Sequence, residues 1–469
     1  GNPAYNVQVA ASLRGRLHVD ALEAALTEIV RRHETLRTTF SVTRGEPRQI
    51  ISAPRPLRLS PLRLAEWPED AREAEALRLA SEEAMRPFDL TRGPLFRTLL
   101  IRLGDEHHVL VLTMHHTITD GWSTGVLFRE LRALYRAFST GRPSPLPELP
   151  IQYADFAVWQ REQLHGEGFQ KQLAYWKRQL GGDLPAVNLP TDRPRPGIQS
   201  FRGARHSFLL SKEMADALKA LSLDEAATLY MALLAAFTIL LFRYERQNEI
   251  VIGTPIAGRT SVETEDLIGF FVNPLVLRID LSGDPTFREL LARVREVALD
   301  AFTHQDVPFE KVVEALRPQR SLGSSPLFQV WFVVQSSSNP ELDLEGLTVT
   351  PVEPDDAPLD RGPAGTARHD LRLGLSRLPS GALSGTIEYR TDLFTASTIV
   401  SIIRSYESIL RNILERPDAR LSVLVDRVAA VESEEETRRQ LEHREAARRA
   451  LTSSRRKPLP SGAANRSNR

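Results

Sequence analysis

The sequence predicts an α/β protein made of two α+β halves of similar size. Amphipathic helical patterns alternate with short apolar runs in both halves of the 469-residue chain, as expected where helices pack against sheets. Pro185, Pro190, Pro194 and Pro196 lie between the halves, and prolines at this density disfavour regular structure. We therefore expect a first lobe over residues 1–180, a second lobe over residues 181–430, and a charged, flexible linker or tail over residues 431–469.

The first half opens with an amphipathic helix. Leu22, Leu26 and Ile29 recur at three- and four-residue spacing, and Asp20 is in position to cap the first turn. His33 continues the apolar stripe and is expected to be a partly buried histidine whose hydrogen bonds are satisfied. The other elements expected in this half are a helix over residues 69–85, neighbouring strands over 95–103 and 108–116, a helix from about residue 123, and a helical stretch over 153–180.

The second half repeats this pattern of helices and strands. Its longest apolar stretch, residues 226–242, is shorter than the ~20 residues that a bilayer requires, so we expect a buried core helix rather than a membrane span. A long irregular connection is expected over residues 336–368. The elements expected in this half are strands over 204–210, 249–254, 275–281, 327–335, 371–375 and 384–389, and helices over 212–221, 227–244, 287–304 and 396–414.

Composition excludes several classes of function. The 60 Lys and Arg residues balance the 60 Asp and Glu residues, which argues against a nucleic-acid-binding protein, because such proteins neutralise phosphates. Without cysteine there is no disulfide, thiolate zinc site or cysteine nucleophile. The N-terminus lacks the basic start and apolar core of a secretory signal. We expect a soluble, cytoplasmic protein.

One cluster of residues is suited to catalysis. His115 and His116 end the strand expected over residues 108–116, and Asp120 and Gly121 precede the next helix. Side chains alternate along a strand, so only one of the two histidines can face a given cleft. An imidazole accepts and returns protons near neutral pH, whereas Asp120 before a glycine is expected to hold the loop by pairing with an arginine. These residues alone leave a purely structural role open.

Two rival chemistries find less support in the same segment. A metal site is conceivable, but adjacent histidines on a strand seldom bind one ion, and no H-E-x-x-H spacing occurs. A serine nucleophile is unsupported because no G-x-S-x-G is present. The residues considered as metal ligands are His107, His108, His115, His116 and Asp120.

The chain resembles a condensation domain of a nonribosomal peptide synthetase. The family's H-H-x-x-x-D-G motif is intact from His115 to Gly121. Other family motifs follow in the family's order, and the resemblance covers roughly residues 1 to 430. They are R-H-E-x-L-R-T-x-F at residues 32–40, Y-x-D-[YF]-A-x-W-Q at 153–160, I-G-x-F-V-N at 268–273 and H-Q-D-x-P-F-E at 304–310.

The resemblance implies the fold and the reaction. The fold is expected to be two chloramphenicol acetyltransferase-like lobes in a V-shaped pseudo-dimer, with an active-site tunnel between them. The expected reaction joins a donor acyl or peptidyl thioester to the amine of an acceptor aminoacyl thioester. Both substrates ride on 4'-phosphopantetheine arms of peptidyl carrier proteins, so no cofactor is expected on this chain itself. The family's usual opening segment, S-x-A-Q-x-R-L-W, is missing before Gly1, so an early strand or tunnel wall is expected to be incomplete. The resemblance also implies a monomeric domain of a larger synthetase, next to an adenylation domain.

The resemblance also assigns roles within the histidine motif. His116 is expected to hydrogen-bond the attacking amine, and Gly121 to allow close approach and face the developing oxyanion. His115 is expected to support the turn. Asp120 is expected to form an ion pair with an arginine of the second lobe, Arg259 first or Arg278 as the alternative.

Other members of the superfamily provide the alternatives. The motif wording favours an L-configured donor and an L-configured acceptor. A catalytically silent domain that recruits tailoring enzymes or carriers is possible, although such relatives typically have a damaged histidine motif. An epimerisation-domain relative shares H-H-x-x-x-D-G, but Trp122-Ser123 and residues 32–40 argue against it. A coenzyme A-dependent acyltransferase is a weaker option.

Overall fold

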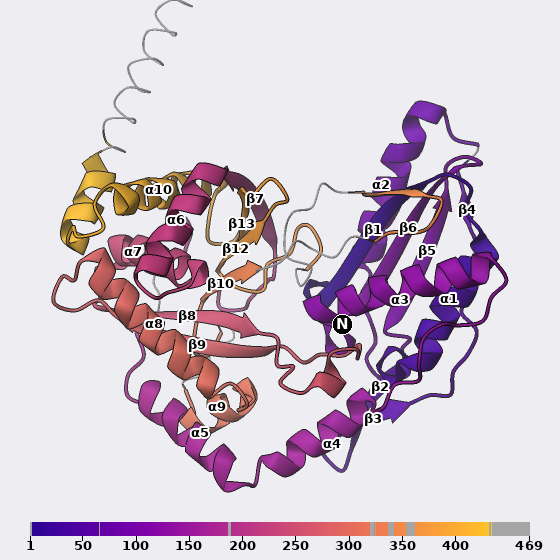
Figure 1. Ribbon diagram of the computed structural model, residues 1–469, viewed down its shortest axis with the longest axis horizontal. Helices are drawn as coiled ribbons and strands as arrows, with labels where there is room; N and C mark the ends of the chain where they lie inside the picture. Colours follow the sequence, from indigo (N-terminus) through magenta and orange to yellow (C-terminus); the bar gives the residue numbers. More distant parts are fainter. Residues whose placement is uncertain are drawn as a thin grey trace, which may run out of the picture.

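The protein consists of two α/β lobes that lie side by side (Figure 1). The computed structural model describes residues 2–64, 66–185, 189–318, 323, 325–335, 342–352, 362–430 and 433. Each lobe has its own sheet and its own hydrophobic core. The two α+β halves expected from the sequence are confirmed. The tail expected over residues 431–469 lies outside the described residues apart from Ser433.

The first lobe is a sheet covered by helices on both faces. Alternate residues of its central strand β6 (His107–His115) point to opposite faces. Leu110, Leu112 and Met114 pack with α1 (Val19–Arg32) and α3 (Gly121–Ser139), whereas Val109 and Val111 pack with α2 (Glu69–Met85). The strand order is β11 (Thr348–Pro351), β1 (Asn6–Arg14), β6, β5 (Phe96–Arg102), β4 (Leu62–Arg63), and a separate hairpin pairs β2 (Thr38–Thr43) with β3 (Glu46–Ile51).

The second lobe is built around helix α7 (Leu229–Glu245), in which residues 231–241 are all buried. Helices α6 (Lys212–Asp224), α8 (Phe287–Thr303) and α10 (Ala396–Glu415) pack around it. No single helix among the described residues has the length and apolar composition to cross a membrane, although the bent pair α6 and α7 meets that test together. The strand order is β7 (Gly203–Leu210), β13 (Leu383–Arg390), β12 (Leu371–Arg377), β10 (Val330–Gln335), β8 (Glu249–Ile256), β9 (Asn273–Asp280).

Helices α4 (Tyr153–Gln163) and α5 (Glu167–Gln179) connect the lobes along the lower edge of the view in Figure 1, and strand β11 joins the first lobe near the top of that view. Helix α4 bridges the lobes, and α5 packs Tyr175 and Trp176 into the second core. The sequence predicted one continuous helical stretch here, but the chain turns between the two helices. Strand β11 crosses back from the second half and pairs antiparallel with β1 of the first sheet.

Several local expectations differ from the structure. Helix α1 begins at Val19 with His18 as its N-cap, so the prediction of Asp20 as the cap was wrong. Asp20 instead lies in the first turn, where its charge still favours the helix N-terminus. The connection over residues 336–368, expected to be irregular, contains strand β11. Its pairing partner β1 lies more than 300 residues away in the sequence, so no local pattern marked it as a strand. Strand β1, the β2–β3 hairpin and the short helix α9 (Phe309–Leu316) were also not predicted.

Candidate active site

The histidine motif lies where a central strand of the first lobe gives way to a helix. Strand β6 ends at His115, a short 3-10 turn covers His116–Ile118, and α3 begins at Gly121. Asp120 is the N-cap of α3, and its Oδ1 accepts a hydrogen bond from the Ser123 backbone N–H at 2.8 Å. The motif therefore spans a strand end, a tight turn and the capped start of a helix, which fix its backbone through hydrogen bonds.

The ring of His116 has a defined tautomer. Its Nδ1 lies 2.8 Å from the carbonyl oxygen of Thr119. A carbonyl oxygen only accepts, so Nδ1 carries the hydrogen and donates it, which puts the lone pair of the neutral ring on Nε2. The ring of Phe270, from the second half of the chain, meets the His116 ring edge-on with centroids 5.2 Å apart. An imidazole held this way is oriented to accept a proton at Nε2.

His115 has a different environment from that of its neighbour. Its Nδ1 accepts a hydrogen bond from the Thr117 backbone N–H at 3.2 Å and lies 2.9 Å from the Thr117 hydroxyl. The rings of Tyr5 and Phe88 lie with their centroids 6.3 and 6.0 Å from that of the His115 ring. Burial, reinforced by the nearby His116, lowers the pKa of His115 to about 4. His115 is therefore neutral near pH 7, and its hydrogen bonds support the turn.

Asp120 and Arg259 join the two halves of the chain through a buried ion pair. The Arg259 Nη2 lies 3.3 Å from Asp120 Oδ1, and the two side chains are 1% and 0% exposed. Burial lowers the pKa of the Arg259 guanidinium, and the charge of Asp120 opposes that change. The alternative partner, Arg278, instead pairs with Glu249 at 2.8 Å within the second lobe.

Residues 258–273 of the second half form a crossover loop that is attached to the first lobe around this ion pair. Asp120 Oδ2 accepts the Phe271 N–H at 2.9 Å. The Ser123 hydroxyl accepts the Gly269 N–H at 3.0 Å and donates to the Gly269 carbonyl at 2.8 Å. The side chain of Ile268 is buried in the core of the first lobe. The crossover loop is thus folded as part of the lobe that carries His116.

The motifs at residues 153–160 and 304–310 hold this loop from the other side. The hydroxyl of Tyr153 donates to the Phe270 carbonyl at 2.7 Å. Asn273 donates to the carbonyls of Gln305 and Val307 and accepts from the Phe309 N–H, all within 2.9 Å. These contacts give both motifs a packing and loop-shaping role.

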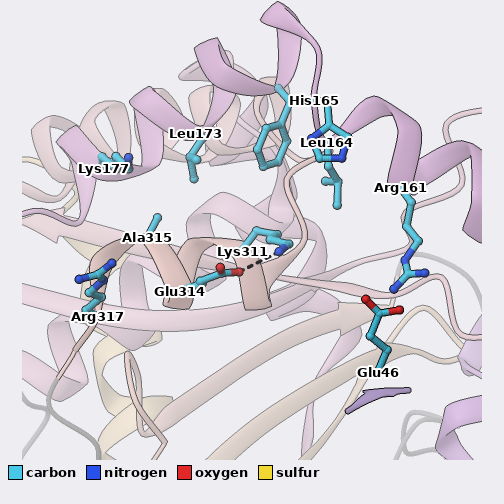
Figure 2. A pocket seen from close by; sticks show the side chains of 11 residues that line it. Glu46, Arg161, Leu164, His165, Leu173, Lys177, Lys311, Glu314, Ala315 and Arg317 are labelled. Carbon is cyan, nitrogen blue, oxygen red and sulfur yellow. Dashed lines mark hydrogen bonds and ion pairs between the residues drawn. The ribbon is translucent and has the colours of Figure 1, made fainter. Parts of the chain in front are cut away.

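Two pockets share lining residues, and the smaller one borders the crossover loop. A cavity of about 420 Å³ is lined by aromatic side chains that include Tyr153, Phe156 and Phe270, so the ring that contacts His116 also forms part of this cavity. Leu164 and Phe169 are shared with a larger pocket of about 1000 Å³ between α4, α5 and α9. Figure 2 shows its charged lining, with Arg161 pointing toward Glu46. Its basic residues are Arg161, His165, Lys177, Lys311 and Arg317.

Comparison with known proteins agrees with this geometry. A family model described as the condensation domain matches residues 1–434. The chain belongs to the condensation domain family. The resemblance inferred from the motifs is thereby confirmed, and so are the two acetyltransferase-like lobes.

Relatives of this condensation domain are parts of much longer proteins. It is 49% identical over 414 residues to one of the linear gramicidin synthase proteins of Brevibacillus parabrevis, covering 88% of this chain but 5% of that protein. It is 41% identical over 425 residues to the phosphinothricin tripeptide synthetase PhsC of Streptomyces viridochromogenes, covering 90% of this chain and 38% of that protein. The chain thus spans well under half the length of these relatives.

Solved structures give the same result for the fold. The X-domain from teicoplanin biosynthesis matches with a TM-score of 0.81 and 34% identity, covering 89% of this chain and 92% of that chain. The condensation domain of the Monacolin K polyketide synthase MokA matches with a TM-score of 0.75 at 24% identity, covering 89% and 94%. At this lower identity the likeness shows the fold alone.

Sequence reasoning missed two features of the site. Ser123 was seen as part of the motif but not as a contact to Gly269 and, through its hydroxyl at 2.8 Å, to Arg259. Phe270 was not singled out as the ring against His116. The motif positions marked both segments, but nothing local to either residue reveals a partner more than 130 residues away. Among the described residues, no three His, Cys, Asp or Glu side chains converge to hold a metal ion.

Proposed function

We propose that this condensation domain forms an amide bond between a donor acyl or peptidyl thioester and the amine of an acceptor aminoacyl thioester, both held on carrier proteins. The observation that carries the proposal is the hydrogen bond from His116 Nδ1 to the Thr119 carbonyl, because it directs the basic Nε2 away from the turn. The intact motif and the relation to peptide synthetases support the same reaction.

The chemistry needs few protein groups, because a thioester carbonyl is already activated. The acceptor amine attacks the carbonyl carbon of the donor, and His116 Nε2 accepts the proton that the nitrogen loses as the C–N bond forms. The tetrahedral intermediate then expels the thiolate, which takes a proton from His116 as the C–S bond breaks. The products are an amide on the acceptor arm and a free thiol on the donor arm. Holding both arms in line supplies much of the rate enhancement.

Gly121 and Asp120 have different roles in this proposal. Gly121 is the first residue of α3, so its backbone N–H lies at the positive end of the helix, where it favours a developing oxyanion. Asp120 is fully buried. Its carboxylate accepts the Ser123 N–H as the N-cap of α3, accepts the Phe271 N–H and pairs with Arg259. It therefore acts on architecture, by joining the crossover loop to the histidine motif.

The two connected pockets provide a path for one carrier arm. The phosphate of a 4'-phosphopantetheine arm is an anion, which the basic lining of the larger pocket favours. The aromatic cavity continues from that pocket to Phe270, next to His116. We place one arm along this path, with its thioester close to Phe270 and His116. The arm belongs to the carrier, so this chain needs no cofactor of its own.

A two-carrier assay read by intact-protein mass spectrometry tests the proposal. Donor and acceptor are loaded on separate carrier proteins, L- and D-configured donors are compared, and the chain is compared with its His116→Ala variant. We expect amide product with the L donor and a loss of about 100-fold or more in the variant. Equal rates for the variant would refute the role of His116, and a preference for the D donor would refute the L-donor, L-acceptor assignment.

The wider context is part of the same proposal. We propose that the domain works as a monomeric unit of a cytoplasmic synthetase, next to an adenylation domain and between two carrier proteins. The relatives' multidomain length supports this arrangement.

A second candidate function is recruitment of a tailoring enzyme. The X-domain from teicoplanin biosynthesis has been solved in complex with OxyB, and it matches this chain with a TM-score of 0.80 and 34% identity. Under this alternative, the assay gives no product from any pair of loaded carriers that bind the domain. The complete histidine motif and the defined tautomer of His116 favour catalysis.

A further inference from the structure

A cluster of buried charged and polar residues lies between α1 and α3. Arg32 and His33 end helix α1, and Glu130 faces them from α3. All three are at most 4% exposed. The Arg32 guanidinium grips both oxygens of Glu130, at 3.0 and 3.2 Å. Burial by itself raises the pKa of the Glu130 carboxyl, but the hydrogen bonds from His33 and Arg32 outweigh it and the pKa is lowered. The carboxylate is therefore charged and held in place.

His33 connects this cluster to the crossover loop. The backbone N–H of Ile268 donates to His33 Nδ1 at 3.2 Å, across 235 residues of sequence. A backbone N–H only donates, so Nδ1 must be the acceptor and the hydrogen of the neutral ring must be on Nε2. Nε2 lies 3.0 Å from Glu130 Oε2, which accepts that hydrogen. Glu130 thus selects the tautomer of His33 that can hold the loop.

The loop continues from this contact directly to His116. Ile268 is buried in the first core, and two residues later the ring of Phe270 meets the His116 ring edge-on. The backbone between them is held by Ser123 at Gly269. A shift of Ile268 therefore moves Phe270, because only Gly269, which is hydrogen-bonded to Ser123, lies between them.

We propose that His33 is a positioning residue of this domain: with its tautomer set by Glu130, it holds the Ile268 N–H and so keeps Phe270 against His116. The inference rests on the proposed function for its kinetic consequence, but the contact between His33 and the loop exists independently of the reaction. Substrate binding at the pockets does not involve His33, which lines neither of them.

Two conservative substitutions of His33 separate its two hydrogen bonds. His33→Asn keeps an acceptor near the position of Nδ1 and loses the contact with Glu130, which remains paired with Arg32. His33→Gln keeps a donor near the position of Nε2 and loses the acceptor for the Ile268 N–H. The two variants remove the same ring and each keeps one of its two hydrogen bonds, so a larger loss in His33→Gln than in His33→Asn reports the loop contact. His206→Gln, on the edge strand β7 of the other lobe, controls for loss of a histidine.

Three measurements compare the His33 variants with the wild-type chain. In the two-carrier assay we expect kcat of His33→Gln to fall by about tenfold or more with little change in KM, because small misplacements of catalytic groups are costly. The kcat of His33→Asn should fall by no more than about threefold, because this variant keeps an acceptor for the Ile268 N–H and so keeps the loop in place. Hydrogen exchange at the Ile268 amide should accelerate in His33→Gln and stay slow in His33→Asn. The ¹⁹F resonance of 4-fluorophenylalanine at position 270 should shift in His33→Gln alone.

The outcomes separate this inference from the proposed function. Equal kcat values in the two variants, or unchanged Ile268 exchange in His33→Gln, would overturn the positioning role. If both variants lose the same amount of unfolding free energy but keep the wild-type kcat, His33 only stabilises the fold and the inference is wrong. If the wild-type chain makes no amide while Ile268 exchange and the Phe270 resonance respond as expected, His33 still positions the loop and the proposed function is the one that fails.

Discussion

Replacing Asp120 with alanine tests the joint between the lobes. The wild-type carboxylate is fully buried and accepts hydrogen bonds from two backbone N–H groups, those of Ser123 and Phe271, besides its ion pair with Arg259. The variant loses an N-cap, worth about 1 kcal/mol, and leaves the Phe271 N–H unsatisfied, at about 1–3 kcal/mol. It also leaves a buried guanidinium without its counter-charge, although Arg259 keeps contacts with backbone carbonyls and Ser123.

The total loss expected for Asp120→Ala is about 4 kcal/mol of unfolding free energy, within the range measured when one partner of a buried pair is removed. Asp120→Asn keeps an acceptor oxygen and should cost about half as much, since mainly the charge is lost. The matched control is Asp266→Ala. Asp266 pairs with Arg129 at 2.5 Å, but both side chains are more than half exposed, so its loss should cost less than about 1 kcal/mol.

Urea denaturation with linear extrapolation measures these differences. The soluble yield of Asp120→Ala should fall as well, together with condensation activity. The double variant with Arg259→Ala completes a cycle in which we expect the two losses not to add, because both remove the same interaction. A soluble Asp120→Ala protein within about 1 kcal/mol of the wild type, or an Asp266→Ala protein that is equally damaged, would refute the assignment of Asp120 to architecture.

Three other predictions concern pH, loop geometry and the basic pocket. The pKa of His115 falls from its ordinary 6.5 to about 4 on folding, so its contribution to stability is complete above pH 6.5 and declines as pH falls toward 4; relative to His115→Asn, the loss in urea titrations should be about 3 kcal/mol. A Cβ at position 258, where φ is +64°, would lie 2.1 Å from a backbone oxygen of the crossover loop, whereas Gly283, at φ +83°, has open space. By calorimetry, Gly258→Ala should lower the unfolding free energy by at least about 3 kcal/mol and Gly283→Ala by about 1 kcal/mol. Equal losses would contradict the close contact. Lys177→Glu in the basic pocket should raise the KM for one carrier several-fold at low salt, and Lys171→Glu, on the same helix outside the pocket, should not.

Much of the local structure could be read from the sequence, because it depends on neighbours along the chain. Helix α2 (Glu69–Met85) has the predicted bounds. The β6–turn–α3 unit that holds His116 also lies where the motif indicated. Helix α7 was expected to be buried because residues 226–242 are almost wholly apolar, and it is. Where local signals were weak, as for β1, β11 and Asp20, the expectation was absent or wrong.

The partners within the site depended on the tertiary structure. From sequence, Arg259 and Arg278 were both available to Asp120; the lobes bring Arg259 to 3.3 Å and leave Arg278 with Glu249. His33 was expected to be satisfied, but its partner Ile268 lies 235 residues away. Such contacts form only when two lobes with separate cores pack together, and no periodicity or spacing records that packing. The sequence alone therefore determined the family, most of the elements and the place of the histidine motif, while the packing of the lobes decided which distant groups contact the imidazole.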